Sequence, residues 1–121
     1  MSLLAKWKTN IDSRWWMAAF WLAWCASTIL MLLPAKDLPQ VNIWDKAEHA
    51  GTFFALMTLA WLGYRKNFAA WQLAALLISY GMAIECIQFF IPSRSFSVLD
   101  MVADTTGVLP AWWLASRIKP S

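Results

Sequence analysis

Four long apolar runs, separated by short polar segments, make up most of the 121-residue chain. Pro34 ends the first run and Pro92 the third, and the second is long enough for a span only when the polar stretch 44–49 is counted with it. A helix needs about 20 residues to cross the bilayer hydrocarbon. We therefore predict an all-α integral membrane protein, with one domain over residues 1–121. Its four antiparallel transmembrane helices are expected at residues 15–33, 44–64, 68–91 and 98–118.

The composition agrees with this prediction. Apolar residues make up 60% of the chain and charged residues 14%, whereas a soluble domain is about half apolar and about a quarter charged. Such a composition excludes a disordered chain, a disulfide scaffold and a multidomain enzyme. The first apolar run is too long for a cleaved signal peptide, so we expect it to be retained as a span.

Lysine and arginine residues are distributed unevenly between the two predicted sides of the membrane. Seven lie on the side of the termini and three on the other side, and the positive-inside rule places the richer side in the cytoplasm. We therefore predict that both termini are cytoplasmic. This asymmetry accounts for the net charge of +3 without a nucleic-acid partner. Six of the seven acidic residues, and the only histidine, fall on the outer side.

The outer polar residues of three helices are predicted to lie at one depth. We expect Asn42 and Ser97 to cap the second and fourth helices, because each stands three residues before an aspartate. With those starts, His49, Glu85 and Asp104 lie about 9–11 Å below the outer ends of their helices, at 1.5 Å per residue. Three different helices thus bring ionisable groups to the same level.

Ionisable groups inside a membrane are expected to face one another or a wet cavity, because facing lipid costs several kcal/mol. Gly51, Gly81 and Gly107 lie on or beside the polar faces, and small residues let membrane helices approach closely. We predict an outward-facing polar pocket between the second, third and fourth helices. Its candidate ligand-binding residues are Asp45, Lys46, His49, Glu85, Gln88, Arg94, Ser95, Asp100 and Asp104.

These residues form an ordered set of short motifs. In chain order the motifs are Asp45-Lys46-x-x-His49, Glu85-x-x-Gln88, Pro92-x-Arg94-Ser95 and Asp100-x-x-x-Asp104-x-x-Gly107. Together they resemble the VanZ-like family over residues 44–111. The resemblance implies a small multi-pass protein of the bacterial cytoplasmic (inner) membrane, in a family whose founding member is associated with teicoplanin resistance. Many members have Asn where this chain has Asp104, so the pocket is expected to be more acidic here.

Each feature also has a purely structural interpretation. Asp45 and Asp100 can be helix caps, Lys46 can extend its ammonium group to the headgroups, and His49 can link helices through hydrogen bonds. Arg94 can simply neutralise a nearby acid. For the set as a whole we favour a functional site, because linking helices does not require three ionisable groups at one depth.

The outer cluster has five acids against two bases, and burying that excess is costly. Either Glu85 or Asp104 stays protonated, or the pocket binds a cation. Oxygen ligands suit Ca²⁺, Mg²⁺ or Mn²⁺, and adding His49 permits Zn²⁺. We expect no metal or other cofactor, because the spacing matches no ligand motif. Cys25 and Cys86 lie in different spans and are expected to be small apolar filler.

Three functions remain open on the sequence. The first, which we favour, is binding of an envelope lipid or glycopeptide-related headgroup, with Lys46 and Arg94 contacting an anion. The second is an enzyme acting on a lipid-linked substrate, with His49 and Glu85 as general base and acid. The third is a small proton-coupled exporter assembled as a homo-oligomer. The exporter is least favoured, because the acids cluster on the outer side.

Overall fold

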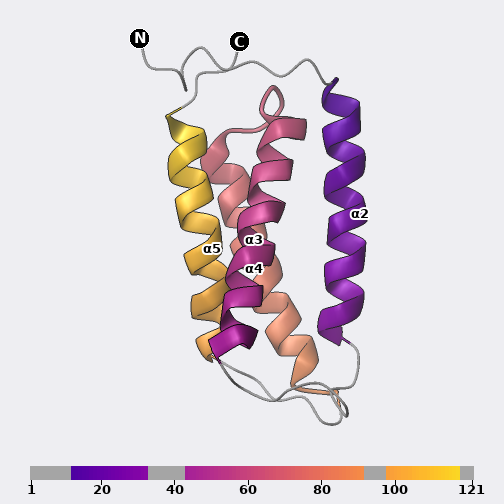
Figure 1. The fold of residues 1–121 in the computed structure, drawn as a ribbon, viewed down its shortest axis with the longest axis vertical. Helices are drawn as coiled ribbons and strands as arrows, with labels where there is room; N and C mark the ends of the chain where they lie inside the picture. The colour runs from indigo at the N-terminus through magenta and orange to yellow at the C-terminus, as the bar shows by residue number, and fades with distance from the viewer. Residues whose placement is uncertain (1–11, 33–42, 92–97, 118–121) are drawn as a thin grey trace.

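The computed structural model describes residues 12–32, 43–91 and 98–117. Over these residues it contains four helices and no strand, as predicted (Figure 1). The helices begin and end within three residues of the predicted spans, whereas the predicted caps Asn42 and Ser97 lie outside the described residues. The helices are α2 (Ser13–Leu32), α3 (Ile43–Tyr64), α4 (Ala70–Gln88) and α5 (Val98–Ser116).

Successive helices run in opposite directions and form an elongated antiparallel bundle (Figure 1). α2 begins and α5 ends at one end, together with the short turn that joins α3 to α4; we call it the turn end. At the opposite end, which we call the polar end, α3 and α5 begin and α2 and α4 finish. The predicted polar residues of α3 and α5 lie in their first two turns, so the topology gathers them at the polar end.

Two of the described helices, α2 and α4, are long and apolar enough to cross a membrane, judged by length and composition. α3 and α5 carry charged residues in their first two turns and do not meet that criterion. Only Phe20 of α2 is buried, while Leu22 and Leu30 are 73% and 63% exposed. Such an exposed apolar surface suits lipid contact. The crossing by α3 and α5, and which end faces the cytoplasm, stay predictions.

The interior of the bundle is centred on α3. Phe53, Leu56 and Met57 have no exposed surface, and α3 packs most extensively against α5. Gly107 of α5 makes this possible, because a Cβ at that position would overlap the backbone carbonyl oxygen of Ala50 on α3. A close backbone approach through glycine is a common way to pack helices in membranes.

Side-chain hydrogen bonds at the starts of α2 and α4 explain why these helices begin where they do. The Arg14 N–H donates a hydrogen bond of 2.9 Å to Oδ1 of Asp12, which caps α2. That backbone hydrogen bond also holds the pKa of Asp12 below its ordinary value. At the start of α4, the Ala69 N–H donates to Oε1 of Gln72 at 2.8 Å, satisfying one of the amides that a helix start leaves without an intrahelical acceptor.

Candidate functional site

An ion pair joins the first turns of α3 and α5 at the polar end. Lys46 donates from its Nζ to Oδ1 of Asp100. The Lys46 side chain is 21% exposed and that of Asp100 is 12% exposed, so the pair is partly accessible. Asp100 is therefore more than a helix cap, because its carboxylate contacts a side chain of another helix.

One turn deeper, His49 of α3 lies between two carboxylates of α5. Its Nδ1 is 2.9 Å from Oδ1 of Asp104, and its Nε2 is 3.8 Å from Oδ2 of Asp100. The side chains of His49 and Asp104 are 9% and 3% exposed. A neutral imidazole donates from one nitrogen and a protonated imidazole from both. The geometry therefore gives each ring nitrogen of His49 a carboxyl group as its neighbour.

Glu85 brings the third acid, from α4. It has no exposed surface, and its carboxyl group interacts with that of Asp100. Glu85 thus adds a third carboxyl group to the two that α5 supplies. We call this group the polar cluster: Lys46, His49, Glu85, Asp100 and Asp104.

Gln88 makes a contact with α2 that was not predicted. It is 1% exposed, and its Nε2 donates a hydrogen bond of 2.6 Å to the backbone carbonyl oxygen of Met31 on α2. The last carbonyls of a helix have no intrahelical donor, so this bond satisfies one of them. In this structure Gln88 links α2 to α4 at the polar end.

Several predicted features need correction or fall outside the described residues. The side chain of Asp45, and all of Arg94 and Ser95, are not described. Gly81 does lie at the cluster, since a Cβ there would be 2.9 Å from Oδ2 of Asp104. Gly51 does not, because a Cβ there would meet nothing within 4 Å. The predicted role of Gly51 in helix approach is therefore wrong.

Metal binding and cysteine pairing find no support in the part of the chain that is described. None of its groups of three or more His, Cys, Asp or Glu side chains could hold a metal ion. Cys25 and Cys86 are free thiols with exposed positions on α2 and α4. The expectation that they fill the apolar interior is therefore wrong, and both lie on the surface of the bundle.

Sequence reasoning missed how α2 takes part in the polar contacts. Besides the Met31 carbonyl, the Thr28 hydroxyl of α2 forms a hydrogen bond with the Tyr80 hydroxyl of α4. A backbone carbonyl leaves no signal in a sequence. A phenol within an apolar span does leave one, because a buried tyrosine hydroxyl usually finds a partner.

The comparisons with known proteins agree with the resemblance read from the motifs. A family model described as VanZ/LLP1 matches residues 5–119, which is nearly the whole chain. Neither a curated protein nor a solved structure matches it. The matched region includes all four described helices and every residue of the polar cluster. The chain belongs to the VanZ/LLP1 family.

Proposed function

We propose that the polar cluster binds the headgroup of an envelope lipid or a related glycopeptide group, and that this binding alters envelope properties, including susceptibility to glycopeptide antibiotics. The observation that carries the proposal is the gradient of accessibility across the cluster. The Lys46–Asp100 pair is partly exposed, while Glu85 and Asp104 beneath it are almost fully buried. A ligand would thus meet an ion pair first, above a floor of acids.

The chemistry of the pair suggests which headgroup it would accept. If Lys46 turns to a phosphate, Asp100 is left to accept hydrogen bonds from an amine, hydroxyl or amide of the same ligand. A headgroup that carries both a phosphate and a hydrogen-bond donor would replace the Lys46–Asp100 ion pair with two contacts, one to each residue. Both contacts are charge-assisted hydrogen bonds, which are stronger than neutral ones. Arg94 is proposed as a second phosphate contact, on the sequence alone.

The floor of the cluster supports this role through its position. His49, Glu85 and Asp104 come from three helices, so a ligand bound above them contacts most of the bundle at once. Because the buried acids already have partners within the cluster, the partly exposed Lys46–Asp100 pair is the place where a ligand can exchange contacts. Burial of the floor then serves to hold that pair in place.

Native mass spectrometry tests the proposal. Wild-type protein would be released from bilayers containing phosphatidylethanolamine and phosphatidylglycerol, beside Lys46→Gln and the matched control Lys66→Gln. Lys66 is exposed in the turn between α3 and α4, at the opposite end of the bundle. We expect Lys46→Gln to lose the retained phospholipid and Lys66→Gln to keep it. Equal retention in both variants overturns the proposal.

A second candidate function is catalysis on a lipid-linked substrate, and the His49–Asp104 contact favours it. A carboxylate that holds one ring nitrogen fixes the tautomer and leaves the other nitrogen able to transfer a proton. Asp104 lies 2.9 Å from Nδ1 in this way, and Glu85 would supply the acid. Turnover of a panel of lipid phosphates that disappears in His49→Gln supports catalysis, whereas a wild type without turnover counts against it.

A further inference from the structure

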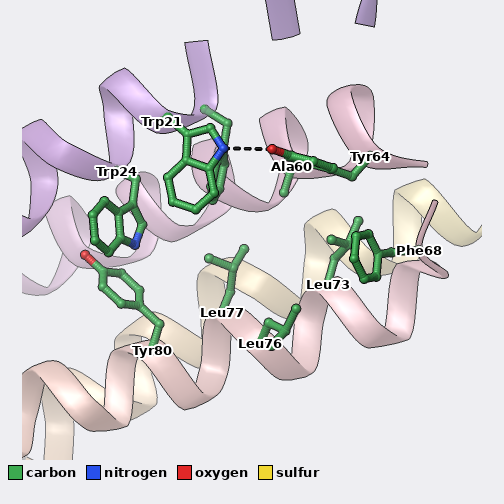
Figure 2. Close-up of a pocket in the computed structure, with 10 residues that line it drawn as sticks. Trp21, Trp24, Ala60, Tyr64, Phe68, Leu73, Leu76, Leu77 and Tyr80 are labelled. Carbon is green, nitrogen blue, oxygen red and sulfur yellow. Dashed lines mark hydrogen bonds between the residues drawn. The ribbon is translucent and has the colours of Figure 1, made fainter. Parts of the chain in front are cut away.

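A half-open groove of about 370 Å³ lies between α2 and α4 (Figure 2). Trp21 and Trp24 of α2 face Leu77 and Tyr80 of α4 across it, and α3 contributes Tyr64 (Figure 2). We call this feature the aromatic groove. It is not part of the polar cluster, because none of the five cluster residues lines it.

The lining of the aromatic groove is apolar, and three of its polar groups have hydrogen-bond partners. Trp21 donates from Nε1 to the Tyr64 hydroxyl at 2.7 Å, and the Tyr80 hydroxyl is bonded to Thr28. The described lining residues include no charged side chain. A bound water needs two to four polar partners, which this lining does not supply, so hydrocarbon is the chemistry that fits.

The groove lies where the hydrocarbon chains of lipids would be present in a bilayer. Its two walls, α2 and α4, are the described helices that are long and apolar enough to cross a membrane. Leu76 on one wall is 59% exposed and Trp21 on the other is 48% exposed, so the groove opens on the outer surface of the bundle. In a bilayer this surface meets lipid chains.

The lining of the groove favours a lipid chain over a helix of another protein. On α4 the lining runs from Leu73 to Tyr80, which is about 10 Å at 1.5 Å per residue. A half-open groove of that length suits a narrow chain that lies along it. The lining also consists mostly of large side chains, whereas helices approach closely over small ones.

The groove is closed toward the polar end. The rings of Trp24 and Tyr80 are in contact there, with centroids 5.6 Å apart, and Tyr80 also contacts Phe53 of α3 at 5.7 Å. A chain lying in the groove would therefore have contacts on several sides. Lipid on an open helix face has contacts on one side only, and dispersion energy grows with the number of contacts.

From these observations we propose that the aromatic groove binds one acyl chain of a bilayer phospholipid. This site goes beyond the proposed headgroup function and does not rest on it, because different residues form the two sites. The bound chain would replace the packing that α2 and α4 do not make with each other along this stretch.

Photolabelling of the full-length protein tests the inference. The protein would be placed in phosphatidylglycerol vesicles that contain a phospholipid with a diazirine on one acyl chain, and labelled residues would be mapped by mass spectrometry. Leu22 is the matched control, since it is adjacent to Trp21 on α2 and 73% exposed but does not line the groove. We expect several-fold more label on Trp21 and Leu76 than on Leu22.

Two substitutions to tryptophan provide a second test of the inference. Leu76→Trp fills the groove from an exposed position that tolerates a larger side chain, and Leu22→Trp adds the same bulk outside it. Leu76→Trp is expected to lower labelling of Trp21 several-fold, and Leu22→Trp to leave it unchanged. Equal label on Trp21 and Leu22 in the wild type, or no effect of Leu76→Trp, identifies ordinary surrounding lipid and overturns the inference.

A third variant separates this inference from the proposed function. Lys46→Gln is expected to leave labelling of Trp21 unchanged, because Lys46 does not line the groove. Loss of retained phospholipid in Lys46→Gln with normal groove labelling supports both sites as independent. Loss of groove labelling in the same variant contradicts the independence proposed here.

Discussion

The polar cluster and the aromatic groove hold helices together in opposite ways. At the cluster, Gly107 brings the backbones of α3 and α5 close, Gly81 leaves room for Asp104, and polar side chains of α3 and α5 contact one another. At the groove, large rings of α2 hold that helix away from α4 and leave a gap. The difference shows that side-chain size decides whether two helices close on each other or leave room for lipid.

The comparison also separates the helices by how firmly each is held. α3 and α5 share backbone contact at Gly107 and two pairs of charged partners. Within the described residues, α2 is held by aromatic packing and by hydrogen bonds in which Gln88, Thr28 and Trp21 take part. We therefore expect substitutions between α3 and α5 to affect the whole bundle, and those on α2 to act locally.

The largest effect is expected from Gly107→Ala. The new Cβ would overlap the Ala50 carbonyl oxygen, so α3 and α5 must separate, at a cost of about 3 kcal/mol in the free energy of unfolding. Gly51→Ala is the control, because nothing lies within 4 Å of its Cβ, and it should gain up to about 1 kcal/mol from helix propensity. Thermal unfolding in detergent measures both. Equal stability of the two variants would contradict the conclusion that close packing at Gly107 holds α3 and α5 together.

A smaller effect is expected from the His49–Asp104 contact. Replacing either residue by leucine should lower the free energy of unfolding by about 2 kcal/mol, because the other is left buried beside an apolar group. The double variant should cost less than the sum of the single variants by about 1 kcal/mol. Denaturant unfolding of the four proteins measures this coupling energy. Strict additivity would mean that the contact at 2.9 Å contributes nothing to stability.

A third prediction concerns the attachment of α2. Gln88→Leu removes the donor to the Met31 carbonyl and is expected to cost about 1 kcal/mol, in line with interhelical hydrogen bonds in membranes. Ile87→Leu is the control, because Ile87 is exposed and its apolar character is kept. Amide hydrogen exchange should quicken at the end of α2 in Gln88→Leu alone. Faster exchange spread over α3 and α5 would contradict a local role for α2.

The smallest effect is expected at Asp12, an exposed carboxylate that lies outside both regions. The Arg14 N–H holds its pKa below the ordinary value of 3.8. Because the folded pKa is lowered, the stability that this cap adds to α2 is present above the ordinary value and is lost as the pH falls through the lowered pKa. The amide proton of Arg14 should titrate with a midpoint below 3.8, and Asp12→Asn should abolish the titration. A midpoint at or above the ordinary value would argue against the cap.

The helices, and the meeting of His49 with Asp104, could be predicted because both depend on local rules. Apolar runs of sufficient length define the helices, and the rise per residue from the expected helix starts puts both side chains at one depth. Gly51 was misjudged for a similar reason. It is two residues after His49, which at 100° per residue is about 200° around the helix, on the opposite face.

Features that depend on how two helices are placed relative to each other could not be predicted from the sequence. Gln88 bonds to a backbone carbonyl of α2, and no residue type marks that acceptor. The aromatic groove exists because the large rings of α2 hold that helix away from α4. A sequence shows which side chains are large, but it does not show which helices they hold apart.

The pairing of α3 with α5 also sets an order of events during biosynthesis. His49 and Asp104 are 55 residues apart in the chain, so at about 5–20 residues per second Asp104 is made about 3–11 s after His49. During that interval α3 has left the ribosome before α5 exists to contact it. If α3 crosses the bilayer as predicted, we expect it to settle there only after α5 has been made and can contact it.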